Sequence, residues 1–226
     1  MTNSINVDVV LVLDCTCSMV PWIKMAKEQL LNIFGDVKKD YPTSDIRVGF
    51  VGYRDICDSP HQFEIVPLTH DHMSVVEKLS MTEAFGGGDI CEDVAGAMRK
   101  LNGMKWRQNA CRLAFHVADA PAHGMLYHHA YISDDFPQES HGVSLFEEIS
   151  LLANTDVSLT FISIDSSTEI MTDKFAEYYS ALDMGDKFKV INFDYRGPNR
   201  GQHLSRMISA DINRSISASI GDPSTP

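Results

Sequence analysis

The sequence of 226 residues is acidic, with a formal net charge of −12, and 44% of its residues are hydrophobic. That length and apolar fraction are enough for one buried core, near the upper size of a single domain. An acidic surface repels phosphate backbones, which argues against nucleic acid as a partner. The sequence also has no run of about 18 apolar residues, so we expect no transmembrane segment.

The N-terminal residues and the cysteines bear on the cellular location of the protein. Met1–Asn6 lacks the basic and apolar regions of a signal peptide. The five cysteines are scattered and odd in number, which indicates reduced thiols and a cytoplasmic location; they are Cys15, Cys17, Cys57, Cys91 and Cys111. Zinc sites usually need a second pair of ligands, so we interpret Cys15 and Cys17 as small loop residues.

The chain shows no internal repeat, and we expect one domain over residues 1–219. Residues 220–226 are rich in Gly, Pro and Ser, a composition typical of a linker or a disordered tail. Such a tail predicts a linker to a further segment, and we expect the chain to be a fragment of a longer protein.

Strand and helix patterns alternate along the chain, beginning with the run Val7–Leu13, which is aliphatic apart from Asp8. Such a run predicts a central parallel strand that is covered on both faces. Pro21 suits the first turn of a helix. Apolar residues at helical spacing then carry this helix to near Tyr41.

Ile46–Tyr53 predicts a second strand, and the turn-rich segment that follows predicts that Gln62–Pro67 returns antiparallel as a third. The later elements are helices over Met73–Leu79, Asp93–Leu101, Leu145–Leu152, Ile170–Leu182 and Leu204–Ile216, and strands over Leu113–Ala118, Val157–Ile164 and Phe188–Phe193. This order predicts an α/β, Rossmann-like, doubly wound fold. Its six-stranded sheet would be mostly parallel, with one antiparallel edge strand and helices on both faces.

Three loops at the carboxyl edge of the predicted sheet carry oxygen ligands. Asp14, Thr16 and Ser18 leave the first strand at alternate positions, Asp89 ends a run of three glycines, and Asp119 follows the fourth strand. The first and fourth strands flank the point where the strand order reverses, so their loops would face each other. Carboxylates and hydroxyls are ligands for hard divalent cations. The sequence therefore predicts a site for Mg²⁺ or Mn²⁺, although strand-end Asp, Thr and Ser residues alone often only cap the next helix.

These residues resemble the metal-ion-dependent adhesion site (MIDAS) of von Willebrand factor type A domains. That family has Asp-x-Ser-x-Ser after the first strand, Thr in a second loop and Asp after the fourth strand. Asp14, Thr16, Ser18 and Asp119 match in order, residue type and strand context, and the resemblance covers essentially the whole chain. It implies that Thr16 and Ser18 contact the metal, while Asp14 and Asp119 often act through water.

Further motifs resemble the type A domains that are associated with alpha-type protein kinases. They are Gly-Gly-Gly-Asp89-x-x-Glu92-Asp93, Ala-Asp119-Ala-Pro-x-His123-Gly, Tyr127-His128 and Asp134-Asp-Phe-Pro137. Asp89 stands where the wider family keeps Thr. A carboxylate among the direct ligands would neutralise part of the cation's charge. We expect Asp89 to bind the metal more tightly than Thr and to weaken its attraction for a partner's carboxylate.

The resemblance implies a non-catalytic protein–protein interaction module. It would bind a protein partner, through an acidic side chain of that partner, and would regulate or localise an alpha-type kinase. One alternative is a metal-dependent hydrolase or phosphotransferase that uses Asp14. That chemistry needs a second acid two residues on, where Thr16 stands, so we expect no enzyme. The other alternative is a structural domain that the metal only stabilises.

Acidic and histidine residues near these loops also have purely structural interpretations. We interpret Glu92 and Asp93 as first-turn acids favoured by the helix dipole, and the same alternative applies to Asp89. Four histidines surround the long loop Pro121–Gly142; they are His123, His128, His129 and His141. We interpret them as solvated or loop-packing residues, because neither Cys nor regular spacing supports zinc there, and a second metal site is the alternative.

Overall fold

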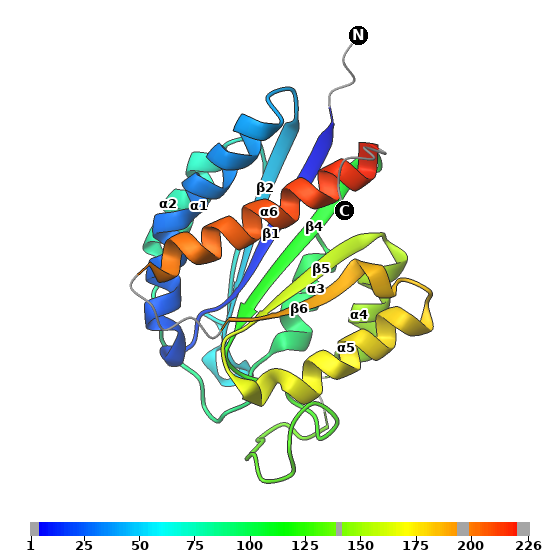
Figure 1. The fold of residues 1–226 in the computed structure, drawn as a ribbon. Helices are drawn as coiled ribbons and strands as arrows, with labels where there is room; N and C mark the ends of the chain where they lie inside the picture. The colour runs from blue at the N-terminus through cyan, green and yellow to red at the C-terminus, as the bar shows by residue number, and fades with distance from the viewer. Residues whose placement is uncertain (1–4, 139–141, 194–198, 221–226) are drawn as a thin grey trace.

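The computed structural model describes residues 5–138, 142–193 and 199–220, and a single six-stranded sheet runs through them (Figure 1). The strand order is β3-β2-β1-β4-β5-β6. The strands are β1 (Asn6–Asp14), β2 (Asp45–Tyr53), β3 (Phe63–Thr69), β4 (Ala110–Ala118), β5 (Val157–Ser163) and β6 (Phe188–Asn192). The edge strand β3 pairs antiparallel with β2, and the other neighbours are parallel. The predicted fold class is therefore confirmed.

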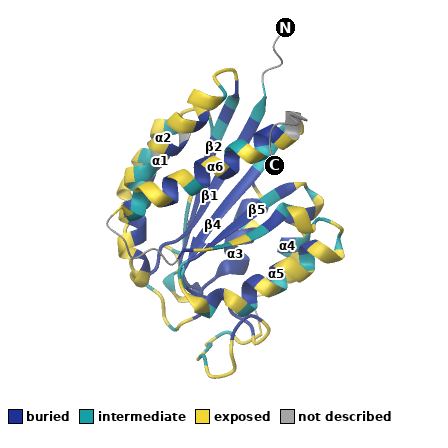
Figure 2. Cartoon of the chain, in the orientation of Figure 1, coloured by how far each residue is buried: buried dark blue, intermediate teal, exposed yellow. Residues whose placement is uncertain are grey.

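Helices cover both faces of the sheet (Figure 1). One face carries α1 (Val20–Asp40), α2 (His72–Met81) and α6 (Arg200–Ile220), and the other carries α3 (Val94–Asn102), α4 (Leu145–Asn154) and α5 (Glu169–Ala181). The sheet thus separates two hydrophobic cores. Figure 2 shows that the strands and the inward sides of the helices are buried, while the outward sides are exposed.

Strand β1 shows why its residues Val9–Leu13 are apolar without interruption. Val9 and Leu11 pack into the core shared with α1 and α6, whereas Val10 and Val12 pack into the core on the opposite face. Successive strand residues point to opposite faces, so a stretch of strand that packs on hydrophobic cores at both faces is apolar on both. Burial of each such side chain stabilises the fold by about 1.5–3 kcal/mol.

The amino end of β1 is neutralised by arginines. The Asp8 carboxylate is fully buried and accepts hydrogen bonds from the Arg47 side chain at 3.0 and 2.7 Å. It also accepts the backbone N–H of Arg107 at 2.8 Å and its Nε–H at 2.9 Å. Burial alone would raise the pKa of Asp8, but these donors and charges outweigh it and hold the pKa below its ordinary value. Asp8 is therefore an ionised, fully paired acid.

Arg54 is fully buried at the start of the turn between β2 and β3. Its guanidinium donates to Glu64 on β3 at 2.7 Å and to the Glu83 carbonyl at 2.6 Å, and it lies 3.9 Å above the Phe85 ring. One side chain therefore joins the edge strand to the glycine loop, which we define as residues 82–93 between α2 and α3.

The predicted elements all occur, with shifts of a few residues at their ends. The largest difference is α6, which begins at Arg200, ahead of the predicted start at Leu204. Its first residues are Arg, Gly, Gln and His, which carry no apolar periodicity, so the sequence pattern begins only at Leu204. Of the predicted tail 220–226, Ile220 ends α6 and the rest lies outside the described residues. In the described parts of the chain, no helix combines the length and the apolar character needed to cross a membrane.

Candidate metal centre at the sheet edge

The strand order brings two distant loops together at the carboxyl edge of the sheet. Strands β1 and β4 are neighbours, but β1 leads to α1 on one face and β4 leads to α4 on the other. The loops that follow these strands therefore diverge from a common point. In open α/β sheets this switch point is where ligands bind.

Four of the predicted site residues form one hydrogen-bonded chain at this point. The Thr16 hydroxyl donates to Asp14 Oδ1 at 2.7 Å, and the Thr16 backbone N–H donates to the same oxygen at 2.9 Å. The Ser18 hydroxyl donates to Asp119 Oδ1 at 2.9 Å, and the two hydroxyl oxygens are 3.4 Å apart. The structure thus brings Asp14, Thr16, Ser18 and Asp119 together. Asp14 and Thr16 are buried, whereas Ser18 is exposed and opens the group to solvent.

Two carboxylate oxygens in this region lack a hydrogen-bond partner among the described residues. They are Asp14 Oδ2 and Glu92 Oε2, and their residues are 0% and 4% exposed. Burial raises the pKa of both acids, and a nearby carboxylate raises it further, Asp119 for Asp14 and Asp14 for Glu92. A buried polar atom without a partner costs free energy that a bound cation would recover. The donor set of carboxylates and hydroxyls suits a hard divalent cation.

Glu92 is the acid of the glycine loop that reaches the Asp14 group. Its backbone N–H donates to the Pro121 carbonyl at 2.9 Å, and it forms a short parallel bridge with Ala122 in the loop after β4. Gly87 covers its side chain, because a Cβ on Gly87 would lie 3.0 Å from Glu92 Oε1. The interpretation of Glu92 as only a first-turn acid missed this contact. The resemblance motif that contains Glu92 was the available signal.

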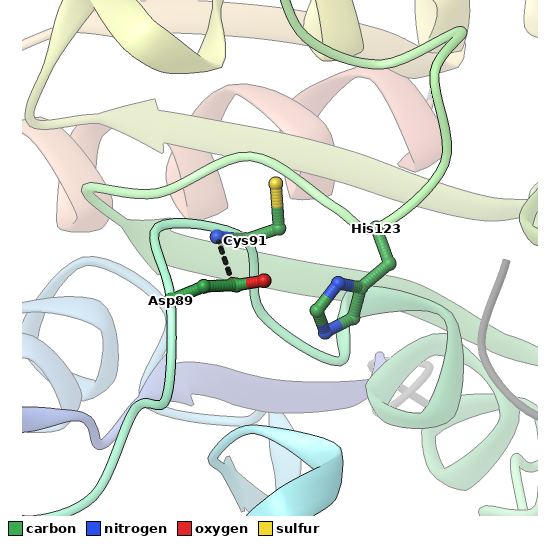
Figure 3. A group of neighbouring side chains, drawn as sticks. All are labelled: Asp89, Cys91 and His123. Carbon is green, nitrogen blue, oxygen red and sulfur yellow. Dashed lines mark hydrogen bonds between the residues drawn. The ribbon is translucent and has the colours of Figure 1, made fainter. Parts of the chain in front are cut away.

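The structure places Asp89 in a different group. Its Oδ1 accepts the Cys91 N–H at 2.8 Å, and its Oδ2 accepts the Asp135 N–H. Asp89 lies with Cys91 and His123 where the glycine loop meets the loop after β4 (Figure 3). Asp93, the third acid of this segment, caps α3 by accepting the Gly96 N–H at 2.8 Å. Only Glu92 of these three acids therefore adjoins Asp14.

His123 and His128 fasten the loop after β4. His123 lies between two carboxylates, 2.8 Å from Asp55 Oδ1 and 2.8 Å from Asp134 Oδ1, and His128 Nε2 is 3.0 Å from Asp134 Oδ2. Burial alone would lower the pKa of His123, but the two carboxylates outweigh it and raise the pKa. Both histidines are buried, so they are not solvated. His129 stacks on Tyr131, and His141 lies outside the described residues.

Large apolar side chains are exposed in the loops that surround this edge. They are Val20 beside Ser18, Phe85 and Ile90 in the glycine loop, and Met125, Leu126 and Tyr131 in the loop after β4. Tyr131 is the most exposed of them, at 82%. Aromatic residues and Met are enriched in protein interfaces, so this rim has a composition that suits a protein partner.

The fold and these loops define a doubly wound α/β domain with an oxygen-ligand cluster at its switch point. No family model matches the sequence. The chain is 29% identical over 215 residues to the alpha-protein kinase vwkA of Dictyostelium discoideum. The match covers 94% of this chain and 33% of that protein, so the chain spans about a third of the relative's length.

Solved structures of similar fold include the pilus adhesin SpaC of Lactobacillus rhamnosus GG. Its open conformation superposes with a TM-score of 0.62, and a second structure of the adhesin gives 0.64. Each is 11% identical to this chain, and each match covers 96% of this chain and 31% of the adhesin. At this identity the likeness concerns the fold alone.

Proposed function

We propose that this chain is a von Willebrand factor type A domain that binds Mg²⁺ or Mn²⁺ at a MIDAS-type site and acts as a non-catalytic protein-interaction module. The observation that carries the proposal is the convergence of Asp14, Thr16, Ser18 and Asp119. They surround a buried carboxylate oxygen, Asp14 Oδ2, which has no hydrogen-bond partner among the described residues. A bound cation would supply that oxygen with its missing counter-charge and would offer a coordination position to a partner.

The hydrogen bonds orient the hydroxyl groups for such a cation. Thr16 and Ser18 each donate their hydroxyl hydrogen to a carboxylate, of Asp14 and Asp119 respectively. Each hydroxyl oxygen therefore keeps its lone pairs for a metal. In this proposal Thr16 and Ser18 are direct ligands, and Asp14 and Asp119 hold them in place. Such outer partners fix the orientation of the ligands of a metal site.

Glu92 adds a second carboxyl group close to Asp14. We propose that it contributes the glycine-loop carboxylate of the site, because Asp89 already accepts two backbone N–H groups. Direct ligation by Asp89 stays a prediction, for which its side chain would have to turn away from Asp135. A carboxylate from either residue would lower the positive charge that the cation presents to a partner. Oxygen ligands alone do not distinguish Mg²⁺ from Mn²⁺.

The kinase relative supports a role next to a kinase domain. That protein is an alpha-protein kinase, and the match covers a third of it. We propose that the matched third is its non-catalytic type A domain, and that this chain regulates or localises an alpha-type kinase in the cytoplasm. The exposed apolar residues around the metal site, which include Val20 and Tyr131, would also contact the partner.

Partner capture by the purified protein tests this function. An alpha-type kinase domain is immobilised, and its retention of this chain is measured with Mg²⁺ and with a chelator, while the melting temperature is followed in parallel. We expect retention with Mg²⁺, loss of retention with chelator, and a chain that stays folded in both. Ser18→Ala should abolish retention, whereas Ser80→Ala, an exposed serine on α2, should not. Retention that is unchanged by the chelator contradicts the proposal. If the chelator abolishes both the fold and the retention, the metal has a purely structural role.

A further inference from the structure

A second group of side chains, outside the Asp14 cluster, has the composition of a transition-metal site. Cys91 Sγ, an imidazole nitrogen of His128 and a carboxylate oxygen of Asp134 all lie within 4.8 Å of one another. The glycine loop supplies the thiol, and the loop after β4 supplies the imidazole and the carboxylate. Thiolate, imidazole and carboxylate together are ligands of Zn²⁺, whereas Mg²⁺ prefers oxygen alone.

The hydrogen-bond partners of His128 call for a cation. Its Nδ1 is 3.0 Å from the His129 carbonyl oxygen, and its Nε2 is 3.0 Å from Asp134 Oδ2. Both partners are acceptors, but a neutral imidazole has a single N–H. When Nδ1–H serves the carbonyl, the lone pair of Nε2 faces the carboxylate, and either a proton or a metal ion must lie between them. Imidazoles that bind zinc commonly donate their other N–H to a backbone carbonyl, as His128 does here.

Asp134 is held in place without any metal. Its Oδ2 accepts the Gly124 N–H and its Oδ1 accepts the Phe136 N–H, both at 2.8 Å, and its side chain is 3% exposed. Burial would raise its pKa, but these N–H donors and the two histidines outweigh burial and lower the pKa to about 2. The carboxylate is therefore ionised and oriented, as a cation ligand needs to be.

The neighbouring group of Asp89, Cys91 and His123 is less suited to a metal (Figure 3). His123 lies between the carboxylates of Asp55 and Asp134, which outweigh burial, raise its pKa and favour its doubly protonated form, and that form has no lone pair for a metal. The thiol of Cys91, by contrast, makes a long 4.0 Å contact with the Ser133 carbonyl. This contact is weak, so a metal ion that replaces it costs the Cys91 thiol little hydrogen bonding.

We propose that Cys91, His128 and Asp134 bind one Zn²⁺ ion, with water as the fourth ligand. The thiolate and the carboxylate balance the charge of the ion. Zinc sites place ligands about 2.0–2.3 Å from the metal, so a modest inward movement of the three side chains completes the triangle. The ion would tie the loop after β4 to the glycine loop, one residue from Glu92. The site shares no ligand with the Asp14 cluster.

Metal analysis of the purified protein tests this site. The protein is incubated with equimolar zinc and a large excess of Mg²⁺, passed through gel filtration, and analysed for bound metal. We expect close to one zinc per chain. After exchange with Co²⁺, we expect a thiolate-to-cobalt charge-transfer band. Cys91→Ser should remove that band and weaken zinc affinity about 100-fold, whereas Cys111→Ser, in β4 at the opposite edge of the sheet, should change neither.

Variants of two adjacent histidines, His128 and His129, form the second part of the experiment. His128→Ala should weaken zinc binding as strongly as Cys91→Ser, and His129→Ala, which loses a stacking contact with Tyr131, should not. Asp14→Asn should abolish Mg²⁺ binding and leave zinc in place, which separates this site from the proposed MIDAS. Wild-type protein that elutes without zinc overturns the proposal, and so does a cobalt spectrum without the thiolate band. Either result would mean that protons alone bridge the histidines to Asp134.

Discussion

Ser18 donates its hydroxyl hydrogen to Asp119 although the two residues lie 101 positions apart in the sequence. The bond spans the switch point between β1 and β4 and joins the two loops that diverge there. We expect Asp119→Asn to weaken Mg²⁺ binding about 10- to 100-fold, because the amide can turn its N–H toward Ser18 and misorient the hydroxyl. Calorimetric titration of wild type, Asp119→Asn, Ser18→Ala and the double variant measures this effect. Purely additive losses would show that the bond does not act in metal binding.

Neutralising Asp14 should stabilise the metal-free protein while abolishing Mg²⁺ binding. Its buried Oδ2 has no partner among the described residues and lies near Glu92, which repels it. We expect Asp14→Asn in chelator to gain about 1 kcal/mol, or about 2–4 °C in melting temperature. Differential scanning calorimetry with and without Mg²⁺ measures both effects. A lower melting temperature in chelator would mean that Asp14 is satisfied without a cation.

Variants of Glu92 and Asp89 distinguish which of the two acids is the glycine-loop ligand of the metal. We expect Glu92→Gln to weaken Mg²⁺ binding at least about 10-fold, because it removes the carboxylate next to Asp14. Asp89→Asn keeps one oxygen acceptor and should change the affinity less than about 3-fold, while loosening the Asp135 contact. Parallel titrations of the two variants decide between them. A larger loss in Asp89→Asn would identify Asp89 as the ligand, as the sequence predicted.

Gly87 should tolerate a methyl group poorly. Its φ of +84° is a left-handed conformation that costs other residues about 1–2 kcal/mol, and the added Cβ would crowd Glu92 Oε1 at 3.0 Å. We expect Gly87→Ala to weaken Mg²⁺ binding as well as stability. Gly142→Ala is the matched control, because Gly142 has a φ of +78° and open space around its Cβ position. Equal effects on metal affinity in the two variants would contradict the role of close packing.

Asp8 should make the fold sensitive to acid. Its folded-state pKa lies below the unfolded value of about 3.9, so its stabilisation is complete above that value and is lost as pH falls through the folded pKa. We expect Asp8→Asn to cost about 3 kcal/mol at pH 7 and to flatten the decline in stability below about pH 4. Urea unfolding across pH 2–7 measures this. Asp45→Asn, which removes a partly exposed partner of Arg107, should cost less than about 1 kcal/mol.

The fold was predictable because its signals are local and strong. The five residues Val9–Leu13 are apolar without a break, which is typical of a strand that has helices on both faces. The turn-rich segment after Tyr53 indicated the antiparallel return of β3, which the structure confirms. The juxtaposition of Asp14 with Asp119 then followed from strand order alone, without any knowledge of side-chain positions.

The acids of the glycine loop could not be ranked from sequence. Asp89, Glu92 and Asp93 follow one another closely, but each points to a different neighbour: Asp135, Asp14 and Gly96 respectively. Their directions depend on the bridge between Glu92 and Ala122, a contact between two loops with no periodic pattern. The approach of Cys91 to His128 has the same origin, which is why the cysteine and histidine spacing carried no zinc signal.

Strand β1 contains one buried acid near its start, Asp8, and one at its end, Asp14, and the surroundings of the two acids are opposite. Asp8 is surrounded by arginine donors, whereas Asp14 keeps an oxygen without a partner among the described residues. The unpaired carboxylate of Asp14 destabilises the metal-free fold, and a bound cation can offset that cost. The paired carboxylate of Asp8 stabilises the fold without a ligand. Selection for thermal stability alone would therefore erase Asp14 and keep Asp8. Variants selected for stability under chelator should therefore lose the acid at position 14, and variants selected for metal-dependent binding should keep it.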